Sequence, residues 1–417
     1  MGWCIDSISI NKFLHNVTYM KLHQNNLDSI TKSLKHIFID GYYADDTVRN
    51  LLQSNPKWGS RDRRFIAQSI YTIVRWWRKY LFIAETNLED GDCFDKVLAV
   101  YLFETYGTEL VSPLPFLASV DRYHERVKDA GNVRSITASI PEWIDELGEA
   151  ELGKEKWEKE LFFLNKEADV FVRVNLIKKN SKQVLVDLEK EGVKAESYGT
   201  LLETLRLIER KPLNRLASYL QGSYEIQDAG SQLIAHFLSP ERNAKVIDAC
   251  AGAGGKSLHI AALMQNKGSI LSMDIESNKL KELEKRATRA GVRIIQTREI
   301  KSDTIESLTS SADYLLLDVP CSGIGVLRRN PDDKWKLNKE RIVELISIQQ
   351  KILQEYSCMV KTKGILVYAT CSILPSENDK QIELFLVRNK DFILEKKQTI
   401  YPSEGSDGYF MARLKRV

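Results

Sequence analysis

Two stretches in the C-terminal third of the chain hold the residues best suited to chemistry. Residues 314–325 read YLLLDVPCSGIG, and residues 364–372 read GILVYATCS. Each is an apolar run closed by polar residues, which is typical of a buried parallel strand and the turn after it. Open α/β sheets place their ligands at such strand ends. We therefore expect Asp318, Cys321 and Cys371 to meet at one sheet edge, although a cysteine can also be kept as a small apolar core residue.

A third stretch, DACAGAGGKS at residues 248–257, is predicted to follow a strand and open a helix. Its glycines would let the backbone approach a ligand, and the free amides of the helix start would point toward it. A phosphate-binding P-loop needs glycine six positions before Lys256, where Cys250 stands. A dinucleotide fingerprint that starts at Gly252 lacks its last glycine, because Ser257 replaces it. ATP is therefore disfavoured as the ligand of this turn, and the case for NAD is weakened but NAD is not excluded.

The remaining nucleotide for this turn is S-adenosylmethionine. In this interpretation Asp248 lies near the methionine ammonium group. Asp274, which closes the run SILSMD, accepts hydrogen bonds from the ribose hydroxyls. The alternative is an ordinary tight turn of an α/β protein, but a strand, a glycine turn and a later strand-ending acid occur together as a nucleotide site requires.

The composition leaves the partner open. The chain has 417 residues, 43% hydrophobic and 28% charged, which fits two or three globular domains. A net charge of +3 is too small to indicate nucleic-acid binding by itself. The six cysteines form no Cys-x-x-Cys pair and the six histidines no ligand-spaced cluster with them, so we expect neither metal nor a disulfide framework. No signal peptide or bilayer-spanning run is found, and the expected location is the cytoplasm.

The elements that must position these residues fall into three regions. From about Asn25 to Leu147 the pattern is helical, with one apolar stripe formed by Ile66, Ile70, Ile73, Val74 and Trp77. Basic and aromatic residues gather beside it, and they either grip RNA phosphates and stack on bases or form an ordinary solvated face. They are Arg61, Arg63, Arg64, Arg75, Arg78, Lys79, Trp58, Trp76 and Trp77.

The second region, from Lys156 to about Arg215, reads as a small α/β unit. A strand is predicted within 168–176, a helix over 181–190 and another strand from Gly192 to Ser197. From about Tyr224 to Val417 strands alternate with helices, including one helix over 339–360. That order predicts a doubly wound parallel sheet with an antiparallel end piece.

The motifs DACAGAGGKS, YLLLDVPCSGIGVLRRNPDDKW, YATCSILPSENDKQIE and DGYFMARL together resemble the RNA cytosine carbon-5 methyltransferases of the RsmB and Nop2/NSUN type. The resemblance covers the third region and extends upstream through EIQDAGSQLIAHFL and ADVFVRVNL. The helical part with DRRFIAQSIYTIVR is similar to a NusB-like domain. One departure is Ala253, where the family usually has proline.

The resemblance implies four segments. They are an N-terminal extension (1–24), a helical NusB-like RNA-binding domain (25–150), a small RRM-like α/β domain (151–222) and a Rossmann-like methyltransferase domain (223–417). It also implies S-adenosylmethionine as cofactor and RNA as partner. Ribosomal RNA is the leading substrate, transfer RNA is the alternative, and the chain is expected to act as a monomer without a metal.

The resemblance also assigns roles to residues. Cys371 of the Thr-Cys motif would attack carbon 6 of cytosine, and Cys321 of the Pro-Cys motif would assist release of the methylated base. Asp318 would hydrogen-bond the base near ring nitrogen 3. Lys256 would lie near the reacting groups or simply face solvent, and Arg329 would hold a phosphate or order its loop.

The implied cofactor contacts fall on Asp248, Ala249, Cys250, Ala251, Gly252, Ala253, Gly254, Lys256, Asp274, Asp303 and Asp318, with Asp303 at the adenine end. Two other classes of function stay open at this point. One is an RNA-binding assembly factor without catalysis, which would have no use for two thiols in one cleft. The other is an NAD-dependent reductase, which would bind nicotinamide and not S-adenosylmethionine.

Overall fold

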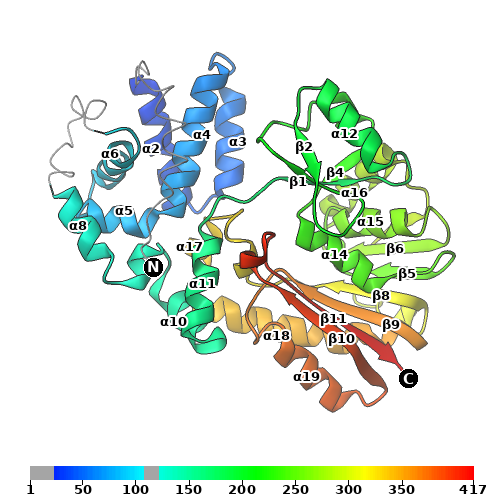
Figure 1. Cartoon of the computed structure of the whole chain (residues 1–417). Helices are drawn as coiled ribbons and strands as arrows, with labels where there is room; N and C mark the ends of the chain where they lie inside the picture. The colour runs from blue at the N-terminus through cyan, green and yellow to red at the C-terminus, as the bar shows by residue number, and fades with distance from the viewer. Residues whose placement is uncertain (1–22, 108–121) are drawn as a thin grey trace. The chain divides into compact units, whose positions relative to one another are not determined.

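The computed structural model describes residues 23–107 and 122–417, shown in Figure 1. Residues 1–22, most of the expected N-terminal extension, lie outside this part. The chain divides into two compact units. One is the chain up to Leu147 together with Asn330–Lys336, and the other is Gly148–Arg329 together with Leu337–Val417. Among the described residues, no helix is both long enough and apolar enough to span a membrane.

The first unit is helical, as the sequence predicts. Its helices are α2 (Gln24–Phe38), α3 (Ala44–Ser54), α4 (Ser60–Arg75), α5 (Trp77–Ile83), α6 (Cys93–Tyr106), α8 (Tyr123–Ala130), α9 (Arg134–Thr137) and α17 (Asp333–Lys336). The predicted apolar stripe of α4 is buried in their shared core. Trp77 is only 3% exposed and stacks on Phe38 with ring centroids 3.9 Å apart, so the expectation that it stacks on a base is wrong.

Helix α17 joins this unit from far along the chain, since it follows the Pro-Cys motif. Trp335 packs against the helical core, and its Nε1 donates to the carbonyl of Val74 at 2.7 Å. The buried Asp332 accepts a hydrogen bond at 2.8 Å from the amide of Ala44, in the first turn of α3. A carboxylate at a helix N-terminus satisfies a free amide and meets the positive end of the dipole. The segment 330–336 is therefore an integral part of the helical unit.

The second unit begins with helices and a small sheet. Helix α10 (Glu142–Leu152) crosses the unit boundary, and α11 (Lys154–Leu164), which the sequence pattern did not predict, follows it. The small sheet has the order β2-β3-β1-β4 and is wholly antiparallel. Its strands and helices are β1 (Phe171–Val174), α12 (Ser181–Lys190), β2 (Ala195–Ser197), β3 (Thr204–Leu207), α13 (Ala217–Leu220) and β4 (Tyr224–Ile226).

The large sheet has seven strands in the order β10-β11-β9-β8-β5-β6-β7. Strands β5 to β9 are parallel, and β11 runs antiparallel to both β9 and β10, as the predicted end piece requires. The strands are β5 (Lys245–Asp248), β6 (Ser269–Asp274), β7 (Ile295–Glu299), β8 (Ala312–Asp318), β9 (Val360–Thr370), β10 (Phe392–Ile400) and β11 (Tyr409–Arg416).

Helices cover both faces of this sheet (Figure 1). Helices α14 and α15 share one apolar core with the strands, and α18 and α19 share a second. The helices are α14 (Ala229–Leu238), α15 (Gly255–Leu263), α16 (Ser277–Ala290), α18 (Lys339–Tyr356) and α19 (Asp379–Arg388). The helix predicted over 339–360 ends at Tyr356, because the chain makes a 3₁₀ turn and enters β9 at Val360.

Candidate functional site

Three of the predicted motifs follow neighbouring strands. Strand β5 pairs with β6 on one side and with β8 on the other, and β8 pairs with β9. The chain moves outward from β5 through β6 and β7 before it returns to β8 on the opposite side of β5. This reversal is the switch point at which open α/β sheets bind their ligands. It brings the glycine turn after β5 beside the Pro-Cys turn after β8.

An ion pair connects these two turns. The Nζ of Lys256, in the first turn of α15, lies 2.5 Å from Oδ2 of Asp318. Burial opposes the charge of Lys256, but the Asp318 carboxylate raises the pKa of this ammonium overall, and Cys371 contributes in the same direction. Lys256 is therefore a charged group inside the site and not a helix-start lysine in solvent.

The two thiols lie together at the ends of β8 and β9. The Sγ atoms of Cys321 and Cys371 are 3.2 Å apart, and the amide of Cys371 donates to the sulfur of Cys321 at 3.3 Å. The contact with Cys371 and burial both raise the pKa of Cys321 well above its ordinary value. Cys321 is therefore held as a protonated thiol, able to donate a proton.

Glycines allow the loops that carry these thiols to pack closely. The amide of Gly325 donates to the carbonyl of Cys371 at 3.0 Å, and the amide of Gly408 donates to the carbonyl of Gly325 at 2.7 Å. A Cβ atom at Gly325 would lie 2.3 Å from the Gly408 oxygen, so no larger residue fits without a shift of backbone. The spacing of the thiols thus depends on backbone contact between three loops.

The glycine turn after β5 is fixed by bonds from neighbouring elements. Gly254 has a φ of +84° and faces Leu283, whose Cγ would lie 2.3 Å from an added Cβ. The carbonyl of Ala253, the position where the family usually has proline, accepts a hydrogen bond from Arg286 at 2.8 Å. Asp274, at the end of β6, accepts from the amide of Gly252 at 2.8 Å. Asp274 therefore lies against the turn, and its expected contact with the ribose hydroxyls stays a prediction.

The groups around this turn fit the cofactor expected from the sequence. Asp248 is fully buried, its Oδ2 accepts from Ser257 at 2.6 Å, and its Oδ1 has no partner among the described residues. Burial raises the pKa of Asp248 to about 7. A ligand ammonium would satisfy such an oxygen. No atom lies within 4 Å of a Cβ built on Gly252 or Gly255, so the backbone there is open to a ligand.

The other residues expected to contact the cofactor differ in how exposed they are. Asp303 is exposed on the loop after β7, while Ala249 and Ala251 are buried and Cys250 is half-buried. Burial raises the pKa of the Cys250 thiol well above its ordinary value. The expected contact of the exposed Asp303 with the adenine end stays a prediction.

Arg329 is occupied within its own unit. Its Nε donates to Asp407 at 2.7 Å and its Nη2 to Asp228 at 3.1 Å. Asp407 is fully buried and also pairs with Arg328 at 3.0 Å. Of the two roles expected for Arg329, the geometry favours ordering of the loop over capture of a phosphate.

The basic residues expected to grip RNA are not equally free. Arg63 donates to the carbonyl of Asn55 at 3.2 Å, and Lys79 pairs with Glu104 at 2.6 Å. Arg61 and Arg64 are exposed. Only part of the predicted basic face is therefore presented to a partner.

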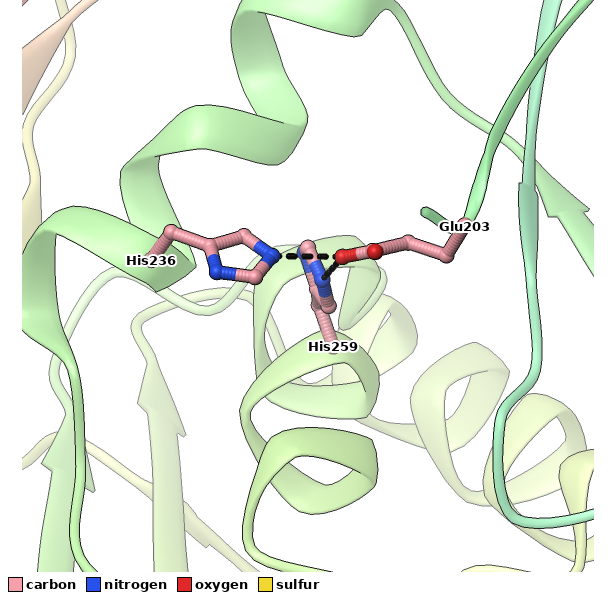
Figure 2. A group of neighbouring side chains, drawn as sticks. All are labelled: Glu203, His236 and His259. Carbon is pink, nitrogen blue, oxygen red and sulfur yellow. Dashed lines mark hydrogen bonds and ion pairs between the residues drawn. The ribbon is translucent and has the colours of Figure 1, made fainter. Parts of the chain in front are cut away.

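A further polar cluster, not predicted from the sequence, lies where the small sheet meets α14 and α15 (Figure 2). The Nε2 atoms of His236 and His259 lie 2.5 and 3.0 Å from the same oxygen of Glu203. The cluster has the ligand types of a metal site. However, these separations are those of hydrogen bonds, and the buried guanidinium of Arg173 repels positive charge at His259. Burial, with this repulsion, lowers the pKa of His259 to about 3.

This cluster therefore acts as a hydrogen-bonded junction between the small sheet and helices α14 and α15, with His259 neutral. Glu203 lies 33 residues from His236 and 56 from His259, so no local spacing could reveal it. Sequence reasoning also missed Glu377 and Asn378, two fully buried polar residues beside the thiols. The only signal for them was their position shortly after Cys371 in the quoted motif.

Comparisons with known proteins place the chain among related sequences. The family described as 16S rRNA methyltransferase RsmB/F matches residues 235–415. A probable ribosomal RNA small subunit methyltransferase B of Synechocystis sp. is 32% identical over 428 residues, covering 90% of this chain and 96% of the relative. The probable enzyme of the same name from Bacillus subtilis is 34% identical over 267 residues, 59% of each chain.

Solved structures show the same fold. The crystal structure of PH0851 has a TM-score of 0.79 and 22% identity, and covers 95% of this chain and 100% of its own. NSun6 from Pyrococcus horikoshii, solved with SFG, has a TM-score of 0.61 and 22% identity, and covers 66% of this chain and 98% of its own. At these identities the likeness concerns the fold alone.

Proposed function

The chain belongs to the RsmB/F family of S-adenosylmethionine-dependent RNA cytosine methyltransferases, and from this premise we propose that it methylates carbon 5 of a cytosine in small-subunit ribosomal RNA through a covalent cysteine adduct. The single observation that carries the covalent route is the contact of two thiols beside the Lys256–Asp318 ion pair. The substrate class is taken from relatives that are named for ribosomal RNA of the small subunit.

The chemistry requires a nucleophile because carbon 5 of cytosine is unreactive by itself. In the proposal the thiolate of Cys371 adds to carbon 6, which makes carbon 5 electron-rich. Carbon 5 would then take the methyl group of the bound cofactor, as the methyl–sulfur bond breaks and a thioether leaves. The carbon 5 proton passes to solvent, its electron pair re-forms the double bond to carbon 6, and the Cys371 sulfur departs as a thiolate. The nearby Lys256 ammonium offsets negative charge at Cys371, and Asp318 is positioned by Lys256 to hydrogen-bond the base.

Cys321 serves the second half of this sequence. Contact with the Cys371 sulfur and burial raise the pKa of Cys321, which suits a thiol that donates a proton. A thiol 3.2 Å from the departing sulfur can donate to it or exchange its proton as the bond to carbon 6 breaks. This supports separate roles for the two cysteines, with Cys371 in attack and Cys321 in release.

The cofactor supplies the electrophilic methyl group on its sulfonium centre. The proposed contacts are the unpartnered Oδ1 of Asp248 to the ammonium, Asp274 to the ribose and the exposed Asp303 to the adenine end. The glycine turn offers its open backbone to the same ligand.

We assign selection of RNA to the parts outside the large sheet. The helical unit is proposed to be a NusB-like domain over 25–150, and the small antiparallel sheet an RRM-like domain over 151–222. Exposed arginines such as Arg61 and Arg64 support contact with phosphates in the first of these. The protein is proposed to act as a monomer.

Two alanine variants test the covalent route. Cys371→Ala should bind RNA and cofactor yet give neither methylated cytosine nor adduct, because the bond to carbon 6 cannot form. Cys321→Ala keeps the nucleophile and loses the thiol that assists its departure. It should therefore accumulate enzyme linked to RNA, seen as a slow band on a denaturing gel, and adding Cys371→Ala should abolish that band.

The same gel separates the competing outcomes. A band trapped by Cys371→Ala instead would mean that Cys321 is the nucleophile. If neither variant changes methylation of ribosomal RNA, both thiols are packing residues and the covalent route is wrong. Transfer RNA incubated in parallel controls for the substrate class, and it should stay unmethylated.

A further inference from the structure

Two consecutive residues, Glu377 and Asn378, lie in the turn between Cys371 and α19. Both are buried, with exposures of 0% and 1%. Each side chain binds a different thiol loop. A buried carboxylate and a buried amide are costly unless they are fully hydrogen-bonded, so their partners indicate what the fold uses them for.

Glu377 binds the loop of Cys321. Its Oε1 accepts from the amide of Ser322 at 2.8 Å, and its Oε2 accepts from the hydroxyl of Ser322 at 2.5 Å. Gln349, fully buried on α18, donates to Oε1 of Glu377 and to the carbonyl of Pro320, both at 3.0 Å. Cys321 is thus held on both sides, through Pro320 and Ser322, by bonds that converge on one carboxylate.

Asn378 binds the loop of Cys371 in the same manner. Its Oδ1 accepts from the hydroxyl of Thr370 at 2.6 Å, and its Nδ2 donates to the carbonyl of Ser372 at 2.9 Å. These two residues flank Cys371 in the chain. Bonds on both sides of one residue fix its backbone, and hence the direction in which its Cβ and sulfur point.

The two sets of bonds share few groups. Between the side chains bound by Glu377 and Asn378, the link is the contact of the Ser322 and Ser372 hydroxyls at 3.3 Å. The loops also meet at the thiols, where the Cys371 amide donates to the Cys321 sulfur. The negative charge of Glu377 also contributes, after the contact with Cys371 and burial, to the raised pKa of Cys321, whereas Asn378 is neutral. A change at either residue should therefore act mainly on one thiol.

We infer that Glu377 is the positioning residue of Cys321 and Asn378 the positioning residue of Cys371, so that adjacent residues set the release and attack steps separately. This inference rests on the proposed roles of the two cysteines. It adds two residues to the reaction that touch neither the base nor the cofactor, and it predicts opposite phenotypes from neighbouring substitutions.

The experiment measures methyl transfer and RNA-linked enzyme in the full-length protein under single turnover. Glu377→Ala should release product roughly tenfold to a hundredfold more slowly and accumulate the linked band, because a thiol displaced by about 1 Å loses that much rate. Asn378→Ala should slow methyl transfer by a similar factor and leave no band. Cofactor affinity should be unchanged in both.

Three controls separate positioning from general damage. Gln381→Ala, at a buried residue that bonds the carbonyl of Ser376 in the same turn, should alter neither step. Glu377→Gln keeps the acceptor for Ser322 and Gln349, so it should restore most of the release rate. Thermal melting identifies any variant that has simply unfolded. For such a variant the donor is changed instead: Ser322→Ala removes a bond to Glu377 and should slow release, and Thr370→Val removes a bond to Asn378 and should slow methyl transfer.

Cys321→Ala and Cys371→Ala are run beside them. If Cys321→Ala traps RNA while both Glu377 variants release it normally, the inference is wrong and the proposed function stands. Equal slowing of both steps by both alanine variants also overturns the inference, since it indicates a shared structural role. If Cys321→Ala traps nothing and Cys371→Ala still methylates, the proposed function fails, and the assignment of the two positioning residues fails with it.

Discussion

The catalytic edge of the large sheet and the core of the helical unit are held together by different kinds of contact. At the catalytic edge, polar side chains connect loops that are far apart in sequence, such as Ser322 with Glu377 and Lys256 with Asp318. In the helical unit, a stripe of fully buried apolar residues on α4 carries the core. Polar bonds are fewer there, and they gather at Glu104, which binds Lys79 and Tyr80, and where the segment 330–336 inserts.

The difference predicts how each region responds to substitution. Apolar cores tolerate changes of shape and lose stability in proportion to the volume removed. A catalytic group that moves by about 1 Å loses rate although stability hardly changes. Substitutions in the helical unit should therefore appear in unfolding experiments, and substitutions at the catalytic edge in kinetics and ligand binding.

The largest effect is expected where the inserted segment meets the helical core. Trp335→Ala removes a large side chain and leaves the carbonyl of Val74 without its indole donor. We expect the helical unit to lose about 3 kcal/mol of unfolding free energy, the lower end of the range for tryptophan because Trp335 is only partly buried. Denaturant unfolding followed by amide hydrogen exchange in α4 measures the loss.

Trp335→Phe is the matched control, since it keeps one aromatic ring while it loses the hydrogen bond and part of the ring volume. Its cost should be smaller than that of Trp335→Ala, about 1 to 2 kcal/mol. If Trp335→Ala leaves exchange in α4 unchanged, the segment 330–336 merely rests on the helices, and the contrast between the two regions is weaker than we describe.

A smaller effect, visible only in ligand binding, is expected at Asp274. Its carboxylate accepts from the amides of Gly252 and Glu276 and is the proposed acceptor for ribose hydroxyls. Asp274→Ala should weaken S-adenosylmethionine binding by about 1.5 to 3 kcal/mol, the range for hydrogen bonds to a charged group. Calorimetric titration measures it, with Asp303→Ala for comparison at the adenine end. Unchanged affinity in a folded Asp274→Ala protein would remove this carboxylate from the site.

The sequence predicted the elements whose pattern is local. Strand β6 and helix α12 have the predicted bounds. The strands before Asp318 and Cys371 lie side by side, as expected, because long apolar runs with abrupt polar ends leave few alternatives to buried parallel strands. Strand β10 was missed for a physical reason. Most of its residues are exposed, so pairing with β11 holds it in place and burial leaves no alternating pattern.

The rest of the site depends on contacts between distant residues. The chain positions of Cys321 and Cys371 do not show that Glu377 and Asn378 hold them, nor that Asp248 is fully buried with one oxygen unpartnered. Likewise, the motif NPDDKW reads as part of the catalytic region, yet it completes the helical core. Such features are decided by tertiary packing, which the periodicity of apolar residues along the sequence does not reveal.

The smallest effect is expected on the surface of the helical unit. Neighbouring arginines there allow exposed side chains to be compared with one that is held by a hydrogen bond. Arg61 and Arg64 are exposed, whereas Arg63 donates to the carbonyl of Asn55. The double variant Arg61→Gln, Arg64→Gln should reduce the salt dependence of RNA binding by about one unit of slope per lost phosphate contact. Methylation at saturating RNA should be unchanged, because neither residue touches the reacting groups.

Arg63→Gln is the matched control within the same helix turn. It should leave the salt slope unchanged, because no phosphate contact is lost. It should lower the unfolding free energy by about 1 kcal/mol at most, because one partly buried hydrogen bond is lost. Filter binding over a series of salt concentrations gives the slope, and denaturant unfolding gives the stability. If Arg63→Gln lowers the slope as much as the double variant does, its bond to Asn55 opens when RNA binds. The helical unit would then rearrange on its substrate, whereas the preformed bonds at the catalytic edge would not need to.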